Sequence, residues 1–133
     1  MRRVAVHAIC SAILAAVLLA APATASPGDD VFRGTWTSVD IDGSNQTLDI
    51  QGSGRTGHHA MFLFDDSATT SCGGSPAHAQ GPGVVDGNTL VMTGTLTCKP
   101  GGNPLRFRIA LGFHYHQGTD TLTDDAGVIW YRA

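Results

Sequence analysis

Two histidines separated by one residue are the chemically most suggestive feature of this chain. In an extended strand, His114 and His116 lie on the same face, about 7 Å apart. That spacing suits two ligands of one metal ion. Arg106 and Arg108 share this face by the same alternation, and their positive charges disfavour a divalent cation. We therefore interpret the face as the polar outer side of a strand and keep His114 and His116 as metal candidates.

A third metal ligand would have to come from the remaining histidines, His58, His59 and His78. His58 and His59 are adjacent, so in a strand they point to opposite faces and cannot act together. The sequence therefore predicts no metal or other cofactor.

An acidic segment, Asp40-Ile41-Asp42-Gly43-Ser44, has a composition that could bind calcium. A calcium-binding EF-hand loop needs glycine at its sixth position and glutamate at its twelfth, and counting from Asp40 these are Asn45 and Gln51. Asp-Gly-Ser is instead typical of a turn in which the aspartate accepts backbone hydrogen bonds.

Hydrolytic chemistry requires a nucleophile beside a base, or two carboxylates in a shielded site. The chain has no Gly-x-Ser-x-Gly motif, and its aspartates lie near expected turns, where we expect solvent to surround them. We predict no catalytic residues and favour a protein that is not an enzyme.

The amino-terminal residues resemble an export signal. Met1-Arg2-Arg3 is cationic, the following residues are almost all apolar, and Ala23-Thr24-Ala25 has the small residues that a signal peptidase reads. We predict a signal peptide over 1–25, a flexible tail over 26–31 and one domain over 32–133. The mature protein would be secreted, with no membrane segment, and the Ala-, Gly- and Asp-rich composition is typical of bacteria.

Two cysteines remain after cleavage, Cys72 and Cys98, because Cys10 lies in the signal segment. In an oxidising compartment one disulfide between them is the simplest expectation. Its loop of 27 residues would restrict the unfolded chain by roughly 3.5 kcal/mol.

The composition from residue 26 onward favours strands over helices. All 17 glycines lie there, the chain has no glutamate, and glycine, threonine and aspartate are poor helix formers. Without Arg2 and Arg3, six basic residues face 11 aspartates, which gives a formal net charge of −5 and no basic footprint for nucleic acid.

Alternating apolar residues and short turns predict eight antiparallel strands. We expect them at 32–41, 46–50, 58–65, 77–85, 89–98, 105–116, 120–123 and 128–132. The strand over 58–65 is apolar at consecutive positions, which predicts that both of its faces are covered. The segment 66–76 is expected to be a loop. Sequential hairpins favour an all-β, up-and-down meander closed into a small barrel, with a sandwich as the alternative.

The two ends of the domain resemble the calycin group of lipocalin-like and avidin-like barrels. Gly34-Thr35-Trp36 stands in the first expected strand and Arg132 in the last. The resemblance implies that Trp36 plugs the base of the barrel and that Arg132 stacks on its indole. A second lipocalin motif is present only in its first half, at Thr119-Asp120, and two tryptophans are too few for an avidin-type cage. No ligand type is therefore carried over.

These features are compatible with four classes of function. We favour a non-catalytic binding module that takes a small apolar ligand at the barrel mouth. The alternatives are a protein-binding module, such as a protease inhibitor that inserts its segment 26–30, a metal-binding or enzymatic barrel using His114 and His116, and an exported protein without a ligand.

Overall fold

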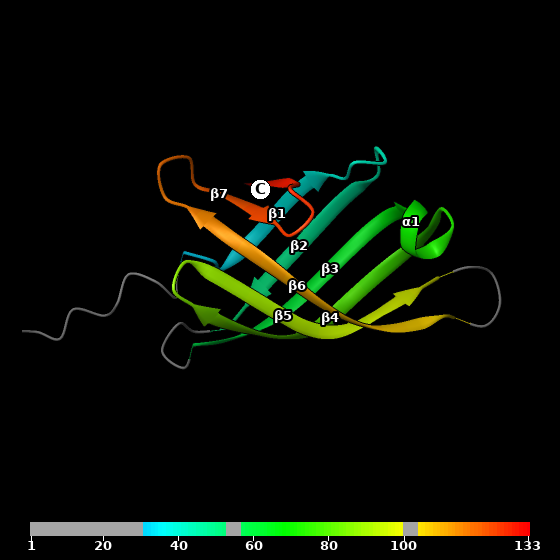
Figure 1. Cartoon of the computed structure of the whole chain (residues 1–133), viewed down its shortest axis with the longest axis horizontal. Helices are drawn as coiled ribbons and strands as arrows, with labels where there is room; N and C mark the ends of the chain where they lie inside the picture. The colour runs from blue at the N-terminus through cyan, green and yellow to red at the C-terminus, as the bar shows by residue number, and fades with distance from the viewer. Residues whose placement is uncertain (1–30, 53–56, 100–103) are drawn as a thin grey trace, which may run out of the picture.

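The computed structural model describes residues 31–52, 57–99 and 104–133 of the chain (Figure 1). The predicted signal segment 1–25 and residues 26–30 of the predicted tail lie outside the described residues. The elements follow the chain in the order β1 (Gly34–Val39), β2 (Asn45–Gln51), β3 (His58–Ala68), α1 (Thr69–Cys72), β4 (Ser75–Asp86), β5 (Thr89–Cys98), β6 (Arg106–His116), β7 (Thr121–Asp124) and β8 (Ile129–Arg132).

The eight strands form a closed antiparallel barrel in which each strand pairs with its neighbours in sequence. The circle is completed by β1 and β8, where Trp36 pairs with Arg132 and Thr37 pairs with Tyr131. This confirms the predicted up-and-down barrel and excludes the sandwich. Closure leaves β1 and β8 without free outer edges where they pair.

Side chains alternate between the inside and the outside of this single sheet, as a two-residue period requires. The interior is filled by large apolar residues that are at most 1% exposed: Phe32, Trp36, Leu48, Ile50, Met61, Leu90, Met92, Phe113, Leu122 and Trp130. Their burial provides the main stabilisation of the barrel.

The expectation that both faces of the third strand are covered is wrong. In β3, Met61 and Leu63 are buried, whereas Phe62 and Phe64 are 44% and 45% exposed on the outer surface. The barrel wall is one sheet thick here, and no second layer of the described chain packs against its outer face.

The expected loop over 66–76 is also wrong in part. β3 continues to Ala68, α1 occupies Thr69–Cys72, and β4 begins at Ser75. β4 is longer than predicted because its glycines do not end it. At Gly81 the backbone of β5 lies so close that an added Cβ would be less than 3 Å from Thr93 and Gly94.

A disulfide joins Cys72, at the end of α1, to Cys98, at the end of β5, with the two Cα atoms 5.4 Å apart. The predicted bond is therefore confirmed, and it is consistent with an oxidising, extracellular setting. We call this end of the barrel the disulfide end. The opposite end, where β1 begins and β8 finishes, is the Arg132 end.

Helix α1 spans four residues, and no helix in the described part of the chain is long and apolar enough to cross a membrane.

Candidate functional site

Trp36 and Arg132 are in contact at the Arg132 end of the barrel. The Trp36 side chain is fully buried, and its indole N–H donates a hydrogen bond of 2.8 Å to the carbonyl of Phe32. The Arg132 Cζ atom lies 4.1 Å from the centroid of the Trp36 ring. At this distance the guanidinium and the indole attract each other as a cation–π pair.

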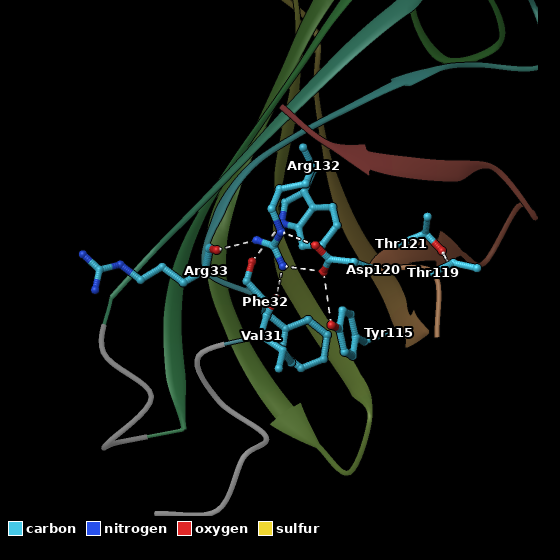
Figure 2. A network of polar contacts seen from close by, with 9 residues as sticks. Val31, Phe32, Arg33, Tyr115, Thr119, Asp120, Thr121 and Arg132 are labelled. Atoms are coloured by element: carbon cyan, nitrogen blue, oxygen red, sulfur yellow. Dashed lines mark hydrogen bonds and ion pairs between the residues drawn. The ribbon is translucent and has the colours of Figure 1, made fainter. Parts of the chain in front are cut away.

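The same guanidinium holds three segments of the chain together (Figure 2). It donates hydrogen bonds to the carbonyls of Val31 and Arg33, at 2.8 and 3.0 Å. It also forms a two-pronged ion pair with the carboxylate of Asp120, at 2.8 and 2.9 Å. Val31, the last residue of the predicted tail, is therefore attached to the barrel in this structure.

The carboxylate of Asp120 accepts hydrogen bonds from both Arg132 and Tyr115. Hydrogen bonds from Arg132 lower the pKa of its carboxyl below the ordinary value. Burial, followed by the hydrogen bond to Asp120, raises the pKa of the Tyr115 hydroxyl. Asp120 also has a left-handed backbone, with φ of 50°, which aspartate tolerates better than most residues. These contacts tie β6, β8 and the amino-terminal segment together, so they stabilise the closure of the barrel.

The sequence missed the roles of Asp120 and Tyr115. The available signal was the half-motif Thr119-Asp120, which stands at the start of the seventh predicted strand.

His114 and His116 lie on the outer face of β6, near its carboxyl end, and both are exposed. Their ring centroids are 4.9 Å apart. Each ring hydrogen-bonds to a neighbouring strand: His114 Nδ1 is 3.3 Å from the Thr89 hydroxyl, and His116 Nε2 is 2.9 Å from the Thr123 hydroxyl.

The other histidines do not join this pair. His58 is exposed, His59 is buried on the inner face of β3, and His78 is half-buried on the outer face of β4. In residues 31–52, 57–99 and 104–133, no three His, Cys, Asp or Glu side chains come close enough together to hold a metal ion. Arg106 and Arg108 lie far from the histidine pair. Even the nearer one, Arg108, is six residues from His114, or about 20 Å along the strand.

The acidic segment after β1 forms a turn. The Asp42 carboxylate accepts hydrogen bonds from the N–H and hydroxyl of Ser44, at 3.0 and 2.7 Å, and from the Thr69 N–H, at 3.0 Å. These bonds, those from Ser44 first, hold the pKa of Asp42 far below its ordinary value. Asp42 therefore connects the β1–β2 turn to the first residue of α1.

One aspartate differs from the expectation that all of them are surrounded by solvent. Asp65, on β3, faces the interior of the barrel and is only 5% exposed. It accepts hydrogen bonds from the Gln46 side chain, at 3.1 Å, and from the Ser67 N–H, at 2.9 Å. The side chain of Asp65 is thus hydrogen-bonded within the protein, as a buried polar group requires.

The disulfide end is where apolar inner surface is left uncovered. On β6, Phe113 faces inward and is fully buried, and Phe107 has the same alternation, as does Leu105 just before the strand. Yet Leu105 is 57% exposed and Phe107 is 45% exposed. Between them and Phe113, the side chains of Ile109 and Leu111 are half-buried against the core.

The reason for this exposure is a difference in strand length. β6 has 11 residues, whereas β7 and β8 have four each. β7 pairs with β6 only from Phe113 to His116, so the wall beside the first half of β6 is missing. The sequence contained this signal, since the predicted strand 105–116 is three times as long as the strand 120–123, but its consequence was not recognised.

Two further apolar hollows lie on the outer surface. Phe62 and Phe64 line a shallow groove of about 400 Å³ together with His78 and Gln80. A second groove of about 660 Å³ runs beside the β1–β8 seam and is lined in part by Val39, Ile41, Ile129 and Tyr131.

The fold and these surfaces define an eight-stranded antiparallel barrel with one closed and one partly uncovered end. No protein-family model, curated protein or solved structure matches the chain.

Proposed function

We propose that this protein is a secreted, non-catalytic binding module of the calycin-like type, which binds its ligand on the apolar inner surface at the disulfide end. The ligand would contact Leu105 and Phe107 and extend towards Ile109 and Leu111. The opposite end is blocked by Trp36 and Arg132, so the ligand would enter from one side only.

The observation that carries this proposal is the exposure of inward-facing residues. Phe107 belongs to the face of β6 that forms the core, and Leu105 precedes the strand with the same alternation, but they are 45% and 57% exposed. Large apolar side chains left uncovered in one place are typical of ligand or partner surfaces.

Secretion and the calycin-like assignment are supported by separate features. The disulfide favours an oxidising compartment, and residues 1–25 have the charge and apolar pattern of a signal peptide. The contact between Trp36 and Arg132 is the arrangement that the resemblance to calycins implies.

The test is a titration of the mature, oxidised protein with N-phenyl-1-naphthylamine, an uncharged probe that fluoresces in apolar surroundings. We expect saturable binding, and a loss of at least about tenfold in affinity in Phe107→Ser, because the variant removes the most exposed aromatic surface from the site.

Phe62→Ser is the matched control, since Phe62 is as exposed as Phe107 but lies on the outer surface. It should leave the affinity unchanged. If the two variants lose the probe equally, or neither does, the site at the disulfide end is wrong. Circular dichroism of both variants checks that the barrel is intact.

A protein-binding module is the second candidate, and the outer groove at Phe62 and Phe64 favours it. Surface aromatic residues on a rigid sheet are common anchors for protein partners. Immobilised wild-type protein should then retain a partner from the culture medium that the variant Phe62→Ser with Phe64→Ser does not retain, while Phe107→Ser still retains it.

A further inference from the structure

The first half of β6 has a neighbouring strand on one side only. β5 pairs with β6 from Arg106 to His114, whereas β7 begins to pair only at Phe113. In Figure 1, β6 runs diagonally across the barrel, and only its last part lies beside β7. The segment 106–111 is therefore an open strand edge in the described structure.

The hydrogen bonds identify which backbone groups face this opening. The N–H of Tyr115 donates to the carbonyl of Asn88, and the carbonyl of Leu105 accepts from the N–H of Cys98. The backbone N–H and C=O groups of the odd-numbered residues of β6 therefore point towards β5. The N–H of Gly112 points the other way and donates to the Asp125 carboxylate, at 2.7 Å. By alternation, the N–H and C=O groups of Arg106, Arg108 and Ala110 face the opening.

Asp125 lies where the pairing between β6 and β7 ends. Its carboxylate occupies the place where the next strand would bond to Gly112, because β7 has already ended at Asp124. An unpaired edge beyond such a point can accept another strand.

The side chains along this edge alternate between the two faces of the sheet. Arg106 and Arg108 are exposed on the outer face, while Phe107 and Ile109 face the inner surface. The only ion pair among the described residues joins Arg132 to Asp120 at the far end, so no acidic partner from the described chain neutralises the two arginines. A strand added here would meet positive charge on one face and apolar surface on the other.

We propose that the open edge of β6 binds an extended polypeptide segment in which acidic and apolar residues alternate. This inference rests on the proposed function and names the chemistry of its ligand. The segment adds a strand beside residues 106–111, its acidic side chains lie next to Arg106 and Arg108, and its apolar side chains cover Phe107 and Ile109. A second copy of β6 does not suit the edge, because its arginines would face those of the first copy.

The test uses a synthetic octapeptide of alternating valine and aspartate, blocked at both ends, with the mature oxidised protein. Calorimetry should show binding at one site, and the peptide should displace N-phenyl-1-naphthylamine. A peptide with four valines followed by four aspartates is the composition control and should not bind, because its charges and apolar groups cannot alternate across the edge.

Backbone methylation of the peptide tests strand pairing directly. Methyl groups on the amide nitrogens of one alternate set of residues should abolish binding, because those N–H groups face β6, and methylation of the other set should spare it. Equal binding of both methylated peptides would overturn the proposal.

Two protein variants test the edge from the other side. Arg106→Gln combined with Arg108→Gln should weaken binding roughly tenfold, while Arg33→Gln, an exposed arginine before β1, should not. Ala110→Pro removes an N–H that faces the opening, so the barrel should fold and the peptide should be lost. Should Ala110→Pro unfold, the arginine variant decides alone.

The outcomes separate this inference from the proposed function. If the fluorescent probe binds in a Phe107-dependent way but no peptide binds, the binding site stands and the polypeptide ligand is overturned. If ultracentrifugation shows a dimer that Ala110→Pro dissociates, the edge is occupied by a second copy, and the proposal is likewise overturned.

Discussion

Trp36 and Arg132 are paired directly across the seam between β1 and β8, so the contact that covers the indole also closes the circle of strands. The first and last strands meet at only two pairs of residues. A seam this short gains much of its stability from side chains, and Arg132 supplies bonds to Val31, Arg33 and Asp120 in addition to the stacking.

Replacing Arg132 by lysine should destabilise the barrel. Arg132→Lys keeps the positive charge but cannot reach two carbonyls and a carboxylate in one plane, nor stack as a flat group on the indole. We expect the free energy of unfolding to fall by about 1–2 kcal/mol in urea titrations. Arg108→Lys, on the outer face of β6, should change it by less than about 0.5 kcal/mol. Equal stability of the two variants would contradict the role of Arg132.

The ion pair of Asp120 should make stability depend on acid. The pKa of Asp120 is lowered in the folded protein, so its contribution is present above the unfolded value of 3.8 and is lost as the pH falls through the folded value. Because the pair is half-exposed, Asp120→Asn should cost about 1 kcal/mol or less at pH 7.

This difference between wild type and Asp120→Asn should shrink as the pH falls from about 5 to 2. Thermal unfolding at a series of pH values measures it. Asp86→Asn, which removes an exposed carboxylate that receives no hydrogen bond from the described residues, is the control. A difference that stays constant down to pH 2 would show that the Asp120 charge does not contribute.

The disulfide between Cys72 and Cys98 should account for a substantial share of stability. Cys72→Ser combined with Cys98→Ser removes a link between residues 26 apart in the sequence, and the free energy of unfolding should fall by about 3.5 kcal/mol. Wild-type protein in reducing agent should unfold at the same urea concentration as the double variant. A reduced wild type as stable as the oxidised form would contradict this prediction.

The close approach of β4 and β5 should make Gly81 intolerant of a side chain. An alanine Cβ there would lie less than 3 Å from backbone atoms of Thr93 and Gly94, so the strands would have to move apart. Gly81→Ala should cost about 1–3 kcal/mol, as overpacking does. Gly118→Ala has no atom within 4 Å of its Cβ and should leave thermal unfolding unchanged. If both variants melt at the same temperature, the close approach of the two strands does not require glycine at position 81.

Much of the fold was predictable because the positions of strands and turns depend on residues that are close together in the sequence. The alternation of Leu105 to Tyr115 with polar residues defined β6 and its faces, and Asp86-Gly87 marked a hairpin. Two cysteines in a segment that follows an export-like sequence were enough to predict the disulfide that the structure contains. The short helix α1 was missed, since four residues with no apolar repeat leave no periodic signal.

The candidate site was predictable only in part. Its residues were predicted to lie in strands. The alternation of apolar and polar residues along β6 shows which face Phe107 occupies, but it does not show whether a neighbouring strand covers that side chain. The exposure of Phe62 was missed for the same reason: consecutive apolar residues do not reveal whether a second layer exists.

By itself, the sequence determined the number of strands, their order and the inner or outer direction of most side chains, because these depend on residues close together in the chain. The tertiary structure decided which residues meet across the barrel: Trp36 with Arg132, Arg132 with Asp120, and β6 with a wall that ends at Gly112. These depend on pairing register and strand length around a closed sheet, where the position of each strand is set by all the others.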